Sequence, residues 1–167
     1  SLGSGSTGAT NVLRHIGKRA AIAVFIIDVS KGVISILLAK YFLLNDSWQV
    51  AIGLSTLFGH IWPVWLNWKG GKAVATGLGI FLGLSWQVGL ATLGVFILII
   101  TLFRIVSLAS ISAALALPLI MFMSFSDSNI SIPFLVISLL AMTLVFWRHR
   151  ENIIRLIKGK EPKIGQN

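Results

Sequence analysis

The chain has 167 residues, of which 56% are apolar and only 11% are charged, and its mean hydropathy is +0.89. A chain of this size has too little interior to bury so much apolar surface, so lipid must cover part of it, which excludes a soluble enzyme, a disordered chain and a fibrous repeat. The excess of 14 Lys and Arg over 5 Asp and Glu gives a net charge of +9, but these cations cluster between apolar stretches, as the positive-inside rule predicts for a membrane protein and unlike a nucleic-acid-binding face.

Five apolar stretches mark the expected membrane region. They run over 20–44, 48–67, 73–103, 105–125 and 130–147. At about 1.5 Å per residue, a helix of about 20 residues crosses a hydrocarbon core of about 30 Å. The polar turns at 45–47 and 126–129 contain no cation, so we expect both to face outward.

The stretch over 73–103 decides the number of crossings. If it crosses once, the strongest basic cluster, which begins at Arg148, lies opposite the other clusters. If it crosses twice, every basic cluster lies on the cytoplasmic side. The stretch is long for one span and short for two, and its glycines before Ser85 favour a short first helix that breaks near Ser85. We therefore predict an all-α, polytopic membrane helical bundle with six membrane segments, some of them short or broken.

The chain begins with a basic, glycine-rich loop and has neither an initiator Met nor a leading apolar segment. We expect a fragment that lacks a preceding membrane helix. Residues 1–167 are expected to form a single integral-membrane domain. Its last part, 148–167, is expected to be a basic interfacial tail on the cytoplasmic side.

Three polar segments on the expected cytoplasmic side combine cations with Gly, Ser or Asn. The first, 3–14, reads Gly-Ser-Gly-Ser-Thr-Gly-Ala-Thr-Asn-Val-Leu-Arg. Glycines let backbone N–H groups converge on an anion, and hydroxyl groups and a helix N-terminus add further donors. A flexible linker over 1–6 is the alternative interpretation, although Asn11 and Arg14 are not typical linker residues.

The second segment, 59–76, joins a Trp-rich stretch to a Lys-Gly-Gly-Lys run at 69–72. Tryptophans followed by lysine are typical of a membrane interface, and this explains the first half of the segment. It does not explain a glycine pair between two lysines, where the backbone can approach a ligand and Lys72 can act as a point charge for phosphate. His60 lies inside the span, where a helix–helix hydrogen bond is an equally good explanation.

The third segment, 148–162, is predicted to be an amphipathic helix. It is interpreted either as an interfacial anchor on anionic lipid or as part of a site. His149 and Asn152 are i,i+3 neighbours, and Arg148, Asn152 and Arg155 fall on one line of such a helix. This spacing would aim a donor–acceptor pair and a guanidinium at one place.

Two opposite charges, Asp28 and Lys31, lie inside the first apolar stretch at i,i+3 spacing. Charges within a membrane helix are costly unless they are paired or face a polar cavity. The pair is therefore either a neutralised structural pair or a support for the same site.

Together the three segments resemble the three motifs of the PlsY family, the bacterial membrane acyl-phosphate:glycerol-3-phosphate acyltransferases. The first resembles that family's Ser-Gly-Ser-Gly-Asn-x-Gly-Ala-Thr-Asn-x-x-Arg loop, the second its Gly-His-x-x-Pro…Lys-Gly-Gly-Lys segment, and the third its His-Arg-x-Asn-Ile-x-Arg-Leu tail. The likeness covers nearly the whole chain in order and spacing. The sequence departs from the family pattern at Ser6, Thr7 and Ala73, where Asn, Pro and Gly are usual.

The resemblance implies transfer of a fatty acyl group from acyl phosphate to the sn-1 hydroxyl of glycerol 3-phosphate, giving lysophosphatidic acid and phosphate without a cofactor. It also implies seven spans in the full protein and an active site on the cytoplasmic face of the bacterial inner membrane. The implied partners are the two substrates, membrane lipid and a soluble enzyme that produces acyl phosphate.

The resemblance also assigns residues to the reaction. Three are expected to be catalytic: Lys72, His149 and Asn152. The residues expected to bind substrate are Ser4, Gly5, Asn11, Arg14, Lys18, Lys31, His60, Lys69, Gly70, Gly71 and Arg155. No side chain is an obvious general base, so departing phosphate is a candidate to take the hydroxyl proton.

Other chemistries have less support in the sequence. An acyltransferase that uses acyl-CoA is expected to contain His-x-x-x-x-Asp, but the residues five beyond the three histidines are Ala20, Trp65 and Ile154. The chain has no cysteine and its histidines are scattered, so we expect no metal site. A transporter of an organic phosphate remains the alternative function, since broken helices and glycines also serve transport. A structural membrane adaptor is a third possibility.

Overall fold

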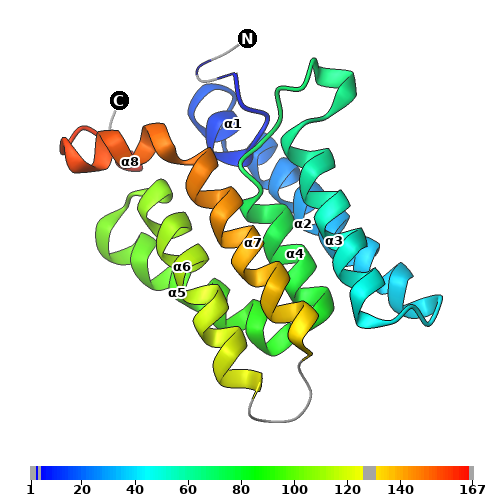
Figure 1. Cartoon of the computed structure of the whole chain (residues 1–167). Helices are drawn as coiled ribbons and strands as arrows, with labels where there is room; N and C mark the ends of the chain where they lie inside the picture. The colour runs from blue at the N-terminus through cyan, green and yellow to red at the C-terminus, as the bar shows by residue number, and fades with distance from the viewer. Residues whose placement is uncertain (1–2, 4, 126–130, 166–167) are drawn as a thin grey trace. The chain divides into compact units, whose positions relative to one another are not determined.

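The computed structural model describes Gly3, 5–125 and 131–165, and its regular structure in these ranges is helical. The chain divides into two compact units, Ser1–Trp86 and Gln87–Asn167, and each is described by itself (Figure 1). The predicted all-α fold is confirmed.

The first unit is built around one long helix. It contains α1 (Ala9–His15), α2 (Lys18–Tyr41), α3 (Asp46–Ile61), the short 3-10 helix η1 (Val64–Leu66) and α4 (Val74–Leu84). Helix α2 packs against the other three α-helices, and most extensively against α4. Helix α2 therefore packs against both α1, which carries the end of the first motif, and α4, which follows the Lys-Gly-Gly-Lys run.

Glycines bring α2 and α4 into close contact. A Cβ on Gly32 would collide with the backbone of Thr76 and Ile80, and a Cβ on Gly79 would overlap the carbonyl oxygen of Val29. Small residues that let backbones approach are typical of helix pairs in membranes, where apolar side chains gain little from leaving lipid. The glycines of this stretch therefore have a packing role as well as marking a short helix.

We expect Gly79→Ala to destabilise the protein by about 1–3 kcal/mol, because the added methyl group has no space and α2 must move. Gly77→Ala is the matched control on the same helix: its Cβ would meet only the Leu57 side chain, at 3.9 Å. The control is expected to be neutral or slightly stabilising, since Ala favours a helix over Gly. Thermal unfolding in detergent measures both, and equal melting temperatures for the two variants would contradict this account.

The predicted break near Ser85 is confirmed. Helix α4 ends at Leu84, Ser85 is extended, and α5 (Trp86–Phe103) follows at once. The ammonium group of Lys40 donates to the carbonyl oxygens of Gly83 at 2.6 Å and Leu84 at 3.1 Å. These carbonyls belong to the last turn of α4. Carbonyl groups in the last turn of a helix have no N–H partner within the helix, and this end of the helix attracts a positive charge. Lys40, to which sequence reasoning gave no role, thus caps the short helix.

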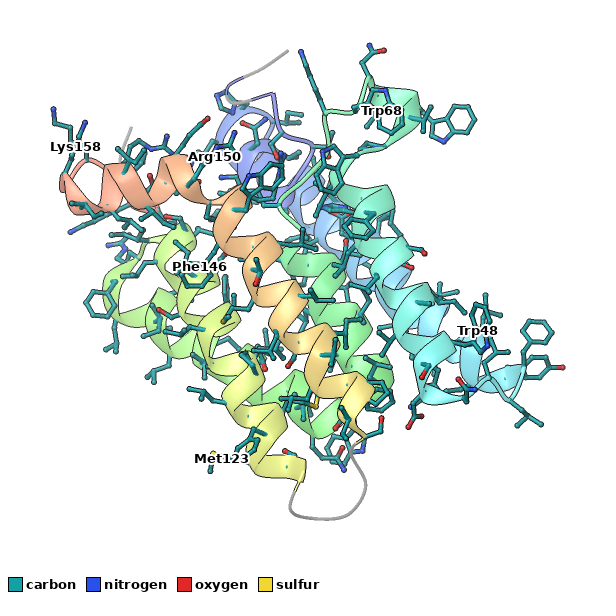
Figure 2. The ribbon with its side chains drawn as sticks, viewed as in Figure 1. Trp48, Trp68, Met123, Phe146, Arg150 and Lys158 are labelled. Carbon is teal, nitrogen blue, oxygen red and sulfur yellow. The ribbon has the colours of Figure 1, made fainter. Side chains whose placement is uncertain are left out.

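Two boundaries in the first unit differ from the prediction. The turn between α2 and α3 lies at 42–44, where Leu43 has φ +54°, and Asn45 instead caps α3 by accepting the Trp48 N–H at 3.1 Å. Within the apolar stretch over 48–67 the α-helix ends at Ile61, because Pro63 has no N–H to continue the ladder, and only the short η1 follows. Figure 2 shows Trp48 near the start of α3 and Trp68 in the loop beyond its end, both exposed as in a membrane-interface belt.

The second unit contains α5, α6 (Val106–Phe125), α7 (Ile132–Arg148) and α8 (Arg150–Ile157). Helices α6 and α7 pack together, and α8 contacts both of them. The predicted outward turn at 126–129 lies outside the described residues. Arg148 ends α7 and a bend of 63° follows, so the single line expected for Arg148, Asn152 and Arg155 is wrong: only the last two lie on α8.

Among the described residues, three helices are long and apolar enough to cross a membrane: α2, α5 and α6. A fourth is possible if the bent pair α7 and α8 is one broken span, and α4 is a shorter apolar helix. Each of the six predicted segments corresponds to a helix, from α2 to α7. How many of them cross the bilayer stays a prediction.

Candidate active site

A buried carboxylate, Glu161, organises the third motif. Its Oε1 accepts from the Asn152 side-chain amide at 2.6 Å and from the Ser107 hydroxyl at 2.8 Å, and its Oε2 accepts from Nε of Arg155 at 2.7 Å. Glu161, Ser107 and Asn152 are all buried. A buried charge is tolerated where it is paired and hydrogen-bonded, and here three donors satisfy one carboxylate.

The local fold explains why these residues meet. Asn152 and Arg155 lie one turn apart on α8, so both side chains leave the same face. Gly159 follows with φ +64°, the left-handed conformation that ends many helices, and the Lys160 N–H bonds back to the Arg155 carbonyl at 2.8 Å. The chain then turns back towards α8 and brings Glu161 to the two side chains.

His149 lies at the junction of α7 and α8, in a buried position. Its Nδ1 lies 2.8 Å from the carbonyl oxygen of Val145. Since a carbonyl only accepts, Nδ1 is the donor in this hydrogen bond. The structure therefore orients both predicted catalytic residues of this motif: a backbone carbonyl fixes His149, and Glu161 fixes Asn152.

The environment of Glu161 also changes its ionisation. Burial raises the pKa of Glu161, but the hydrogen bonds from Asn152, Arg155 and Ser107 and the charge of Arg155 outweigh it, so the pKa falls below its ordinary value of 4.5. A carboxyl whose pKa is lower in the folded state contributes stability that is present above the unfolded-state pKa and is lost as the pH falls through the folded-state pKa.

We therefore expect the melting temperature of the wild-type protein to fall more steeply between about pH 5 and about pH 3 than that of Glu161→Gln, which cannot titrate at this position. The measurement is thermal unfolding in detergent across this range. Parallel curves for the two proteins would show that Glu161 contributes no pH-dependent stability.

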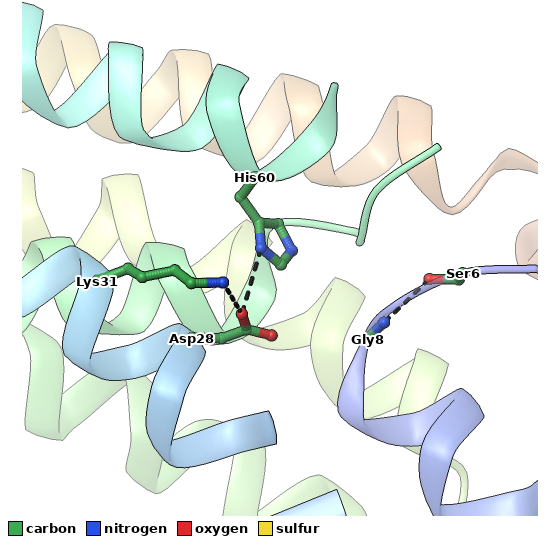
Figure 3. Close-up of polar contacts among 5 residues, drawn as sticks. All are labelled: Ser6, Gly8, Asp28, Lys31 and His60. Carbon is green, nitrogen blue, oxygen red and sulfur yellow. Dashed lines mark hydrogen bonds and ion pairs between the residues drawn. The ribbon is translucent and has the colours of Figure 1, made fainter. Parts of the chain in front are cut away.

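His60 of the second motif lies beside two charged residues of α2, Asp28 and Lys31. Asp28 Oδ1 is 2.9 Å from Nζ of Lys31 and 3.5 Å from Nδ1 of His60 (Figure 3). The Asp28 and His60 side chains are each only 6% exposed, whereas that of Lys31 is 53% exposed. The structure thus shows Asp28 and Lys31 as an ion pair. His60 of α3 is the third residue of this cluster.

The glycine pair of the second motif closes the loop that follows α3. The Gly70 N–H donates to the Ile61 carbonyl at 3.1 Å and the Gly71 N–H donates to the His60 carbonyl at 3.2 Å. A Cβ on either glycine would collide with residue 60 or its neighbours. Both residues are buried, so the pair has a clear packing role, and its expected contact with substrate stays a prediction.

Ala73 stands where the family that the sequence resembles usually has Gly. It is the N-cap residue of α4, has the left-handed conformation at φ +66° and is 1% exposed. This conformation costs a non-glycine residue about 1–2 kcal/mol. We expect Ala73→Gly to stabilise the protein by about 0.5–1 kcal/mol, after allowing for the greater freedom of an unfolded Gly. Thermal unfolding measures the change, and a lower melting temperature would contradict strain at this residue.

The first motif forms a compact loop before α1. Asn11 Nδ2 donates to the Ser6 carbonyl at 2.8 Å. Figure 3 shows the second contact of this loop, in which the Gly8 N–H donates to the Ser6 hydroxyl at 3.3 Å. Gly5 has φ +68°. Ser4 lies outside the described residues. Asn11 therefore has a structural contact in addition to its expected place beside phosphate.

The remaining predicted binding residues of the first unit are cations at its helix ends and loops. Arg14 is near the end of α1, Lys18 begins α2 and Lys69 follows η1, and all three are exposed. Lys72 is half-buried directly after the glycine pair. Each of the two units thus has its own set of predicted residues: the three cations and the loops around Lys72 lie in one, and His149, Asn152 and Arg155 lie in the other.

Sequence reasoning missed Glu161 and Ser107. A signal was present for the first, since Glu161 is an acid in a strongly basic tail and follows Arg155 by six residues. Ser107 gave no signal, because it is one of several serines in an apolar helix and lies 54 residues from its partner. Among the described residues, no three His, Asp or Glu side chains gather as metal ligands would.

Comparison with known proteins gives a consistent result. A family model described as "Glycerol-3-phosphate acyltransferase" matches residues 1–159. A glycerol-3-phosphate acyltransferase of Prochlorococcus marinus strain NATL1A is 87% identical over 99% of this chain and 84% of its own length. Another, from Parasynechococcus marenigrum strain WH8102, is 62% identical over 98% of this chain and 76% of its own length.

Two solved structures are also similar. Both are crystal structures of PlsY (YgiH), an integral membrane glycerol 3-phosphate acyltransferase, one in its glycerol 3-phosphate form and one in its lysophosphatidic acid form. The first has a TM-score of 0.88 and 37% identity, covering 98% of this chain and 80% of the solved chain. The second has a TM-score of 0.86 at the same identity.

Proposed function

Because the chain belongs to the glycerol-3-phosphate acyltransferase family of integral-membrane enzymes, we propose that its acyl donor is acyl phosphate and that its products are lysophosphatidic acid and inorganic phosphate. The observation that carries the choice of donor is the absence from the sequence of a His-x-x-x-x-Asp pair, the residues expected for transfer from acyl-CoA. Two phosphate-bearing substrates also suit a chain with a net charge of +9.

In the proposed reaction the sn-1 hydroxyl oxygen attacks the carbonyl carbon of acyl phosphate. The new ester C–O bond forms as the carbonyl-to-phosphate C–O bond breaks, and the departing phosphate takes the bonding electrons and the hydroxyl proton. The proton thus needs no protein base. Lys72 would stabilise the negative charge that develops on phosphate, since a fixed charge beside the reacting group lowers the barrier.

The third motif would act on the acceptor. The His149 ring, held by the Val145 carbonyl, and the Asn152 amide, fixed by Glu161, would together align the glycerol hydroxyl. The Arg155 guanidinium would add charge for phosphate. The exposed cations Arg14, Lys18 and Lys69, with Lys31, would draw both substrates to the surface.

The remaining assignments follow the positive-inside rule. We place this active site on the cytoplasmic face of a bacterial inner membrane, because the predicted motifs carry the basic residues. Residues 1–167 would form a single acyltransferase domain, with 148–167 as its interfacial tail. Acyl phosphate would come from a soluble enzyme that works at this face.

The test is phosphate release by the full-length protein in lipid, with glycerol 3-phosphate as acceptor. Acyl phosphate, acyl-CoA and acyl carrier protein are offered as separate donors, and mass spectrometry identifies the lipid product. We expect lysophosphatidic acid only with acyl phosphate, in equal amount to the phosphate released. Product formed only from a thioester donor would overturn the proposal.

A further inference from the structure

His60 touches two different parts of the first unit at once. Its Nδ1 lies 3.5 Å from Oδ1 of Asp28 on α2. A carboxylate only accepts hydrogen bonds, so this contact favours a ring with its hydrogen on Nδ1 and turns that edge of the ring towards Asp28. Figure 3 shows the ring reaching from α3 towards Asp28, which Lys31 also holds.

The opposite edge of the ring lies against Gly71. A Cβ on Gly71 would overlap Nε2 and would lie 2.6 Å from Cε1 and 3.2 Å from Cδ2. Only a residue without a side chain fits at this contact. The surface of the ring therefore decides where the backbone of Gly71 can lie.

The main-chain carbonyl of His60 also binds the backbone of Gly71. The Gly71 N–H donates to the His60 carbonyl at 3.2 Å, and the Gly70 N–H donates to the neighbouring Ile61 carbonyl at 3.1 Å. Lys72 follows directly, and Ala73, the N-cap residue of α4, comes next with φ +66°. Lys72 thus lies between a segment held by His60 and the N-cap of a packed helix.

We infer that His60 is a positioning residue for Lys72: Asp28 orients its ring, and the ring and carbonyl of His60 place Gly71 and so the lysine that follows. The inference rests on the proposed function, because it takes from it the role of Lys72. It goes further by giving the buried Asp28 and His60 a purpose within the site without direct contact with substrate.

The competing explanation is that His60 only joins α2 to α3 through Asp28. That role predicts a loss of stability when the ring is removed, but no effect on the substrate affinity of the molecules that remain folded. Because a Cβ on Gly71 would collide with the ring in either case, it predicts coupling between residues 60 and 71 in stability but none in KM. The two explanations therefore differ in KM and in whether the coupling between the two residues appears in KM.

The experiment is a double-mutant cycle on the full-length protein in lipid, with His60→Asn and Gly71→Ala. Asparagine retains an N–H near the Nδ1 position but lacks Nε2 and Cε1, the two ring atoms nearest the added methyl group. We expect each single variant to raise KM for at least one phosphate substrate by about tenfold, and the double variant to lie within about threefold of His60→Asn.

Two further cycles sharpen the result. His60→Gln places its amide near the Nε2 position, so Gly71→Ala should remain as harmful beside Gln as beside His. Gly77→Ala, whose Cβ would meet only Leu57, is the control and should show no coupling with His60→Asn. Should His60→Asn not fold, Asp28→Asn replaces it, since a ring without its carboxylate partner can move and relieve the Gly71→Ala collision.

Unchanged KM values in folded variants, or effects that multiply in the double variant, would overturn the inference. A failure of the proposed function is distinguishable, because it appears in the wild-type protein as the use of a thioester donor. The cycle can then be measured with that donor and still reports whether residues 60 and 71 act on each other.

Discussion

Lys72→Met is expected to lower turnover at saturating substrate by about 100-fold or more, since removal of one group that stabilises transition-state charge costs about 10²–10³ in rate. Methionine has a similar length and no charge, so the half-buried side chain keeps most of its packing. The fold should persist, because the loop around Lys72 is held by backbone hydrogen bonds of Gly70 and Gly71. The measurement is steady-state phosphate release with both substrates in excess.

The control for this variant is Lys163→Met, which removes a charge from an exposed position of the tail. It separates the loss of a specific group from the loss of net positive charge and should retain wild-type turnover. Near-normal turnover of Lys72→Met at saturating substrate would remove Lys72 from the catalytic group.

Glu161→Ala is expected to cost about 3–5 kcal/mol of stability, the range seen when one partner of a buried charge network is removed. The substitution leaves the buried Asn152 amide and Ser107 hydroxyl without their acceptor and the Arg155 guanidinium without its counter-charge. Because Asn152 loses the group that orients it, activity should fall further than the folded fraction. Unfolding by denaturant in detergent and activity per folded molecule measure the two effects.

The matched control is Glu151→Ala, which removes an exposed acid from the same helix α8. It should change stability by less than about 0.5 kcal/mol, as surface substitutions usually do. A Glu161→Ala protein that is as stable and as active as the control would show that the carboxylate does not organise the third motif.

The sequence predicted those features of the fold that depend on short-range chemistry. The break at Ser85 was visible because glycines and a polar residue interrupt a stretch that is too long for one span. The Asp28–Lys31 pair followed from i,i+3 spacing, since residues three apart share a helix face. Helix boundaries near Pro63 were less accurate, because apolar content alone does not reveal where the backbone leaves the helix.

The parts of the candidate site that were missed depend on contacts between distant residues. The Ser107–Glu161 hydrogen bond joins residues 54 apart, and His60 meets Asp28 from another helix. No periodicity relates such pairs, because only the packed helices bring them together. The glycine pair is a further example. Two adjacent glycines indicated that the backbone comes close to another group, but the sequence did not show that this group is His60.

The cap that Lys40 gives α4 also sets an order of biogenesis. Its two acceptors are made 43 and 44 residues later, so a growing chain exposes the ammonium group well before any carbonyl can receive it. An ammonium without such a partner stays hydrated rather than enter hydrocarbon. The contact between Lys40 of α2 and the last turn of α4 therefore forms only after Leu84 has been made, so a nascent chain that stops short of Leu84 lacks this link between the two helices.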